Sequence, residues 1–274
     1  MQKKRLTFGV VAAQASDIEQ RRIMEGIIEK AKELNIDTVV ISNIYNPDGS
    51  EYSLDCHKEN NIYELLNSAG TDGFIIISEA IINTELQKRI RDTLGTRPDI
   101  PVVVAGVQKD DLMLDYFETI STDDTADIEE IADHLIEVHN CTDIDILTGN
   151  PDTDVSVQRT EGYKRSLEKH GIPYDARKVI YGDFWTTSGQ SLAKQYINGE
   201  RHMPQALICA NDYMAYGLLD EFAENGIRVP DDMLVAGYEY ILQRIFHYPV
   251  LSTYCRNRKN LGAEAVNLLY SPDF

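Results

Sequence analysis

Short apolar runs alternate along the chain with segments of helical periodicity. In the amino-terminal half, strands are predicted at 6–12, 38–42, 73–78 and 101–107. Helices are predicted from about residue 17, around 62–66, over 84–94 and from just after Asp123 and Asp124 to near His139. Continuous apolar strands joined by amphipathic helices are typical of βαβ units, whose parallel sheet is covered on both faces.

The same alternation then starts again. Strands are predicted at 143–147, 178–181, 206–209 and 233–238, and helices at 157–170, 187–197 and from Asn211 or Asp212 to Gly226. Two series of similar size predict an α/β protein with two Rossmann-like lobes and parallel sheets. Ligands bind such sheets at the carboxyl ends of the strands. We expect an N-lobe of 1–138 plus 252–274, a C-lobe of 139–251, a ligand cleft between them, and crossover strands near His139 and Leu251 that act as hinges.

The charge balance narrows the possible partners. The 274 residues include 26 Lys plus Arg against 45 Asp plus Glu, a formal net charge of -19. This field repels phosphate polymers and anionic membranes. The densest basic clusters, Lys3 to Arg5 and the Arg256, Arg258 and Lys259 stretch, are short. We therefore expect no direct nucleic-acid binding by this chain and no membrane partner.

The cysteines predict neither a disulfide framework nor a metal centre. All four are widely scattered and form no CxxC pair: Cys56, Cys141, Cys209 and Cys255. His57 beside Cys56 has no second pair at ligand spacing, so we interpret it as a loop histidine. No metal and no cofactor are expected.

The amino terminus allows two interpretations. Lys3 to Arg5, the apolar run 6–12 and then Ala13-Gln14-Ala15 resemble a short secretory signal with its cleavage site. The run is at the lower limit of length for a signal, and it reads equally well as a buried parallel strand that leads to a helix. We favour the strand.

Several segments match, in the right order, the motifs of one known family. The run 206–217 reads as an apolar strand followed by N-D-x-x-A-x-G, and 234–239 resembles V-x-G-[FY]-D. Further matches are found at 71–75, 158–163, 182–189, 227–232, 251–253 and 261–265. Over nearly its whole length the chain therefore resembles the effector-binding core of the lactose/galactose-repressor (LacI/GalR) family of transcription regulators, which has a type I periplasmic-binding-protein-like fold.

Two features depart from the family pattern. Met1 lies a few residues before the first strand, where the family has a helix-turn-helix and a hinge helix, and the chain stops at Phe274, where the family has a further strand. We expect either a part of a longer regulator or a sensor followed by its output domain. The position of Met1 slightly favours the second.

The resemblance implies a set of ligand-binding residues in the C-lobe and names no catalytic residue. Arg159 would offer a planar donor fork to two ligand oxygens, with a surface ion pair as the alternative. Asn211 offers a donor and an acceptor, although a helix cap explains it as well. Phe184, or Trp185 beside it, would stack on a ligand ring, and burial of either ring is an equal alternative.

The resemblance implies two further acids, Glu239 in the C-lobe and Asp124 in the segment 1–138. Glu239 stands where the family has Asp, so its carboxylate reaches about one bond further outward and the ligand is smaller or differently presented than a hexose. Asp124 matches a family acid that accepts from ligand hydroxyls, and a helix cap again explains it equally well.

In the N-lobe, Gln14 and Glu79 follow the first and third strands, so the geometry of a parallel sheet places their loops at the rim of the cleft. They are the preferred pair in that lobe, with solvated loop residues as the alternative.

Three functions are compatible with these residues. The first is a cytoplasmic sensor that closes on a sugar, polyol or nucleoside/purine-like effector and changes the geometry of a homodimer. The second is an exported solute-binding protein of a transporter, which would use the same fold and cleft. The third is an enzyme. The sequence contains no G-x-G-x-x-G after the first strand, no Walker lysine loop, no G-x-S-x-G elbow and no HExxH helix that would support it. The adjacent acids Asp123 and Asp124, or Asp231 and Asp232, more often cap turns than catalyse.

Overall fold

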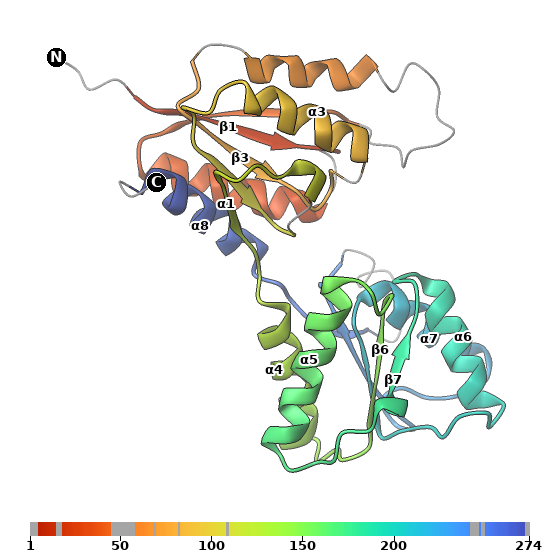
Figure 1. Ribbon diagram of the computed structural model, residues 1–274. Helices are drawn as coiled ribbons and strands as arrows, with labels where there is room; N and C mark the ends of the chain where they lie inside the picture. The colour runs from red at the N-terminus through yellow and green to blue at the C-terminus, as the bar shows by residue number, and fades with distance from the viewer. Residues whose placement is uncertain are drawn as a thin grey trace. The chain divides into compact units, whose positions relative to one another are not determined.

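The computed structural model describes residues 5–14, 18–44, 58–67, 70–81, 83–107, 110–241, 247 and 250–271. The chain folds into two compact α/β units, Met1–Thr122 with Asn257–Phe274, and Asp123–Arg256 (Figure 1). The boundaries differ from the expected ones at 138/139 and 251/252. The reason is packing: the helix Asp124–Glu137 packs along the helix Asp154–Lys169, and the strand Ser252–Tyr254 pairs within the second sheet. Both elements therefore belong to the second unit.

The first unit is built on a parallel five-stranded sheet with the order β2-β1-β3-β4-β5. Its strands are β1 Thr7–Ala12, β2 Asp37–Ser42, β3 Gly73–Ile77, β4 Val102–Ala105 and β5 Phe117–Ile120. Its helices are α1 Ile18–Glu33, α3 Thr84–Gly95 and α8 Arg258–Tyr270, with the 3-10 helices η1 Asn60–Asn67 and η2 Asp110–Leu112. This unit is therefore an α/β fold with a parallel sheet, as predicted.

Alternate side chains of the strands face opposite layers, as the pleat requires. Val10 and Ile75 pack with α1 and α8 on one face, whereas Val11 and Ile76 pack with η1 and α3 on the other. Figure 1 shows α1 and α8 on one side of this sheet and α3 on the other. Because both faces are covered, the strands read as continuous apolar runs in the sequence.

One strand of this sheet was not predicted from the sequence. β5 reads Phe-Glu-Thr-Ile and is the last strand at one edge of the sheet, with Glu118 and Thr119 exposed. An edge strand with polar residues has no continuous apolar run, so periodicity does not reveal it. The segment around 62–66 forms η1, a 3-10 helix instead of an α-helix.

Two glycines let α1 and α8 pack closely. A Cβ atom on Gly26 would lie 1.9 Å from the Lys259 carbonyl oxygen, and one on Gly262 would lie 2.1 Å from the Ile23 carbonyl oxygen. Real side chains do not approach backbone so closely, so only glycine allows this contact. Through it the carboxyl-terminal helix joins the first unit.

The second unit repeats the plan with the parallel order β10-β9-β8-β6-β7. Its strands are β6 Ile144–Thr148, β7 Val179–Tyr181, β8 Ala206–Cys209, β9 Leu234–Tyr238 and β10 Ser252–Tyr254. α4 Asp124–Glu137 and α5 Asp154–Lys169 cover one face, and α6 Thr186–Ile197 and α7 Asp212–Glu224 cover the other. The 3-10 helix η3 Ala176–Lys178 precedes β7.

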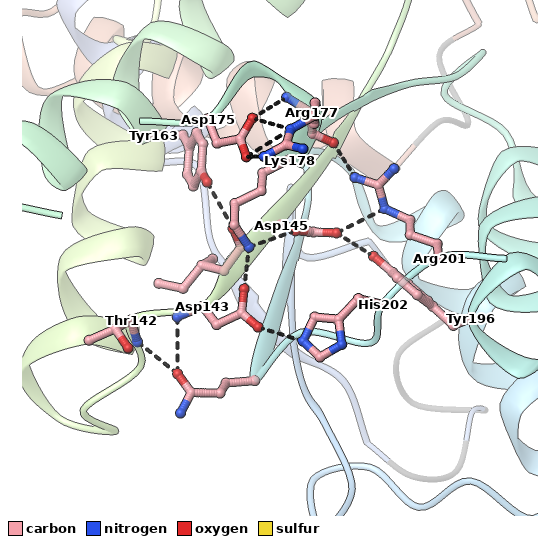
Figure 2. A network of polar contacts seen from close by, with 12 residues as sticks. Thr142, Asp143, Asp145, Tyr163, Asp175, Arg177, Lys178, Tyr196, Arg201 and His202 are labelled. Atoms are coloured by element: carbon pink, nitrogen blue, oxygen red, sulfur yellow. Dashed lines mark hydrogen bonds and ion pairs between the residues drawn. The ribbon is translucent and has the colours of Figure 1, made fainter. Parts of the chain in front are cut away.

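A polar network lies at the amino-terminal edge of this second sheet (Figure 2). The buried carboxylate of Asp145, inside β6, accepts bonds from the Tyr196 hydroxyl at 2.9 Å and from Arg201 Nε at 3.1 Å. Lys178 Nζ lies 3.4 Å from Asp145 and also pairs with Asp143. Charged residues inside a buried strand are tolerated only when they are paired in this way.

Among the described residues, no helix is long and apolar enough to span a membrane. Cys141 and Cys209 are buried free thiols and Cys255 is an exposed one, whereas Cys56 and His57 lie outside the described residues.

Gly262→Ala should lower the free energy of unfolding by about 2 kcal/mol, because a methyl group in a packed contact forces α1 and α8 apart. Urea denaturation followed by circular dichroism measures the change. Glu264→Ala, an exposed substitution in the same helix, is the control and should stay within about 0.5 kcal/mol of the unsubstituted protein. Equal effects of the two substitutions would contradict the close packing.

Asp145→Ala should lower the free energy of unfolding by about 3 kcal/mol, because it leaves the Arg201 and Lys178 charges without their buried partner. The same urea experiment tests this, with the exposed Asp152→Ala as the control. A midpoint for Asp145→Ala as high as that of the control would show that the network contributes nothing to stability.

Candidate functional site

The candidate site lies at the carboxyl-terminal edge of the second sheet. Five of the eight predicted site residues meet there: Asp124, Arg159, Phe184, Asn211 and Glu239. Chain segments far apart in sequence deliver them, because all parallel strands of a sheet end at the same edge.

Arg159, in the second turn of α5, is the centre of the cluster. Its Nε lies 2.9 Å from Asp124 Oδ2, its Nη2 lies 3.3 Å from Glu239 Oε1, and its Nη1 donates to the Ala210 carbonyl oxygen. The Arg159 side chain is only 4% exposed. The surface ion pair considered as an alternative is therefore wrong, since this pair is buried.

Two aromatic rings pack against the same guanidinium. Its carbon lies 4.6 Å from the centroid of the Tyr238 ring and 5.5 Å from that of Phe184. A cation over an aromatic face is stabilised by the ring quadrupole, more strongly when water is excluded. The rings and carboxylates therefore hold the guanidinium in one orientation.

Asp124, the first residue of α4, is bound from several sides. Besides Arg159, its carboxylate lies 3.3 Å from Arg256 Nη2 and accepts a 2.9 Å bond from the Tyr238 hydroxyl. Burial opposes its charge, but the two guanidinium groups outweigh burial and lower the pKa of Asp124. Asp123 makes the N-cap bond of α4, so the cap alternative for Asp124 does not describe its contacts.

Tyr238 also lies 2.7 Å from Asp127, one turn further along α4. A hydroxyl group has one proton, so it donates to Asp124 or to Asp127 but not to both at once. Burial raises the pKa of Asp127, and the ring of Tyr238 is itself buried.

Asn211 and Phe184 are connected by a hydrogen bond. The Asn211 side chain caps α7 by accepting from the Met214 amide at 2.9 Å, and its Nδ2 donates to the Phe184 carbonyl oxygen at 2.8 Å. The predicted helix cap is therefore present, and the ligand-binding role of Asn211 stays a prediction.

Phe184 has an unusual backbone, with φ of 64°. Its ring lies where a Cβ atom on Gly149 would be 1.9 Å from it, so the glycine after β6 makes the space. Trp185, the alternative aromatic, is 61% exposed and packs against Tyr213, with 5.4 Å between ring centroids. The Arg159 cluster therefore has Phe184, and not Trp185, over its guanidinium.

The remaining two predicted residues belong to the first unit. The backbone amide of Gln14, which has φ of 55°, donates to Asn43 Oδ1 at 2.8 Å. The carboxylate of Glu79 pairs with Arg258 of α8, and Gly106 leaves room for its side chain. Both residues follow their strands as expected, and their ligand-binding role stays a prediction.

Sequence reasoning missed three members of the cluster. In the sequence, Tyr238 is part of the 234–239 motif, Arg256 is part of a short basic stretch, and Asp127 belongs to no motif. The spacing of Asp124 and Asp127, which places both on one face of a helix, was the available signal.

Within the described part of the chain, one group of side chains has metal-ligand chemistry. Asp133, Glu137 and His170 have ligand atoms within 4.8 Å of one another. However, Asp133 already accepts bonds from Ser166 and Lys169, each at 2.6 Å. The group therefore joins α4 to α5, and it lies outside the Arg159 cluster.

Comparison with known proteins agrees with this architecture. A model of the periplasmic binding protein-like domain matches residues 132–271, which are 140 of the 274 residues. The HTH-type transcriptional repressor PurR of Vibrio atlanticus is 26% identical over 263 residues, which are 96% of this chain and 73% of the repressor. Across the relatives considered, the matched part spans between 60% and 73% of their length.

Solved structures show the same fold. A LacI family transcriptional regulator from Enterococcus faecium with bound ribose has a TM-score of 0.65 and 23% identity, over 96% of this chain and 88% of that one. The lac repressor dimer bound to operator and an anti-inducer has a TM-score of 0.65 and 21% identity, over 98% of this chain and 86% of that one.

The fold defines a two-unit α/β protein with one parallel five-stranded sheet in each unit. The chain belongs to the periplasmic binding protein-like domain family, and it is similar over most of its length to transcriptional regulators such as PurR. Because the relatives are transcription regulators, the interpretation as an effector-binding regulator is favoured over the exported solute-binding protein and over the enzyme.

Arg159→Met should lower the free energy of unfolding by about 3 kcal/mol at pH 7, because Asp124 and Glu239 lose a buried partner. A depressed carboxyl pKa stabilises the folded state above the unfolded value of 3.8 and stops doing so as the pH falls through the folded value. The deficit should therefore stay constant down to about pH 4 and shrink only below 3.8, as the pH falls toward the folded value.

Urea denaturation at several pH values measures this effect. Arg165→Met is the matched control, because Arg165 lies on the same helix in an exposed pair with Glu161. It should change the stability by less than about 0.5 kcal/mol at every pH. A deficit for Arg159→Met that does not depend on pH would contradict the assigned role of Asp124.

Proposed function

We propose that this chain is the sensor part of a transcription regulator and that it binds a small polar effector at the Arg159 cluster. The observation that carries the proposal is the buried group of Arg159, Asp124 and Glu239 beside the ring of Phe184. Polar ligand sites combine an apolar surface with a few fixed polar groups, and this cluster has both.

The electrostatics of the cluster favour a particular ligand chemistry. The donors of Arg159 are already bonded to Asp124, Glu239 and the Ala210 carbonyl oxygen. Arg159 therefore orients the two acids and is less suited to binding an anionic ligand. Glu239 is the more accessible of the two acids, at 19% against 6% exposed. A carboxylate accepts hydrogen bonds, so the favoured effector carries hydroxyl or N–H donors, as sugars, polyols, nucleosides and purines do.

The ribose bound in one structural neighbour supports this class of ligand. Since Glu239 replaces the shorter aspartate expected from the family pattern, the preferred compound is smaller than a hexose or presents its hydroxyls differently. A pentose is therefore a better first candidate than a hexose.

Effector binding would act through closure of the two units and a change in the geometry of a homodimer. A dimer bound to operator among the structural neighbours supports the dimer. With a net charge of -19, the chain itself is proposed not to contact nucleic acid, so that contact would come from a DNA-binding domain of the regulator. Such a regulator works in the cytoplasm.

Thermal-shift screening against ribose, other pentoses, hexoses, polyols, nucleosides and purines tests the proposal. A bound effector at a hundred times its Kd stabilises the folded chain by about 2.7 kcal/mol and raises the Tm. Glu239→Gln removes the charged acceptor and should abolish the shift, whereas the exposed Glu200→Gln should preserve it. A shift that survives Glu239→Gln would place the effector elsewhere, and no shift with any of these compounds would reject the proposed ligand class.

A further inference from the structure

The segment that follows β9 carries Glu239 in an unfavourable backbone conformation. Glu239 has φ of 101° and Tyr240 has φ of 60°. Both values lie in the left-handed region, which favours glycine and costs other residues conformational energy. Contacts with other elements must therefore hold the Glu239–Tyr240 turn in this conformation.

Three successive amides of this turn each donate to a fixed acceptor. Glu239 N–H donates to the Tyr254 carbonyl oxygen at 3.0 Å and Tyr240 N–H to Thr253 Oγ1 at 3.3 Å. Ile241 N–H donates to Asp212 Oδ2 at 2.9 Å. Two of the three bonds go to neighbouring residues of β10, and the third goes to α7.

Asp212 connects these supports. Its other oxygen, Oδ1, accepts a 2.6 Å bond from the Thr253 hydroxyl, so the same carboxylate holds the side chain that receives the Tyr240 amide. Its side chain fits because residue 237 is a glycine: a Cβ atom there would lie 2.2 Å from Asp212 Oδ1. Asp212 is fully buried.

A simpler role for Asp212 is that of an acid at a helix amino terminus, because it is the first residue of α7. The N-cap bond of α7, however, is made by Asn211. The bonds of Asp212 described above join α7 to β10 and to the turn after β9. Its contacts are therefore those of a support between elements.

We propose that Asp212 is a positioning residue that holds the Glu239–Tyr240 turn and thereby directs the Glu239 carboxylate toward Arg159. The proposal deepens the proposed function, because it rests on Glu239 as an effector contact. The geometry of the turn can be tested without any effector.

The surroundings of Asp212 make this support sensitive to pH. Burial, together with the nearby Glu239 charge, raises the pKa of Asp212 to about 6, although the bonds from Thr253 and Ile241 oppose the rise. The buried Cys209 thiol, at the end of β8, also senses this charge, and burial raises the pKa of that thiol as well. A proton on Asp212 removes one acceptor site, so the turn is held best above about pH 6.

Nuclear magnetic resonance of the isotope-labelled full chain tests the proposal. The Ile241 amide resonance should move with pH around a midpoint near 6, as the acceptor of its bond titrates. Asp212→Asn should abolish this titration but preserve slow hydrogen exchange at Ile241, because an amide oxygen still accepts the bond. Asp212→Ala should accelerate exchange at Tyr240 and Ile241 by at least about tenfold.

Two further variants make the result specific. Asp154→Ala removes the exposed carboxylate of the first residue of α5, which has the same helical position as Asp212 in α7. It should leave hydrogen exchange at Tyr240 and Ile241 unchanged. Thr253→Val keeps Asp212 but removes its hydroxyl partner. It should accelerate exchange at Tyr240 and raise the midpoint seen at Ile241, and it decides the question if Asp212→Ala does not fold.

The proposal would be overturned by turn amides that exchange as slowly in Asp212→Ala as in the unsubstituted chain, or, if that variant does not fold, by unchanged exchange at Tyr240 in Thr253→Val. Neither measurement contains an effector. A failed ligand screen would therefore reject the proposed function and leave the role of Asp212 standing, while unchanged exchange would reject that role even if an effector is found.

Discussion

A buried guanidinium is the constraint on which the candidate site depends. Taking the charge of Arg159 out of water costs several kcal/mol, and only partners with good geometry offset that cost. Asp124, Glu239 and the Ala210 carbonyl oxygen occupy its donors, while Tyr238 and Phe184 lie against its face. These partners come from α4, from the end of β9 and from the segments that follow β7 and β8. The requirement of one side chain on α5 therefore connects α4 and α5 to the ends of three strands.

The parallel sheet is what makes this convergence possible. Residues that follow β6, β8 and β9 reach one edge, and the amino termini of α4 and α7 lie close to it. The opposite edge of the same sheet carries the Asp145 network, whose acids pair with Lys178 and Arg201. Charge is thus buried at both edges of the sheet, but in different forms. In the Arg159 cluster, two aromatic rings lie against the guanidinium beside a partly exposed carboxylate, and this combination suits a polar ligand.

Local strain accompanies the candidate site. Phe184, Glu239 and Tyr240 have positive φ values, and each is held by a bond from another element. Strained non-glycine residues persist only where the surroundings hold them in place, and they gather at functional sites. Gly149 and Gly237 contribute by leaving out a side chain where Phe184 and Asp212 need the space.

The sequence by itself determined the local structure and the class of fold. Strands such as Ala206–Cys209, and the helix from Asp212, were predicted because burial on two faces leaves continuous apolar runs and amphipathic helices leave a stripe. Motif resemblance singled out Arg159, Asn211 and Glu239 within the candidate site. The tertiary structure decided which side chains meet. It moved α4 into the second unit, added the edge strand β5, brought Tyr238 and Arg256 to Asp124 and placed Phe184 rather than Trp185 over the guanidinium. Periodicity reports only how a segment buries itself, whereas partners across 80 or more residues, such as Arg159 and Glu239 or Asp124 and Tyr238, depend on packing that local pattern does not encode.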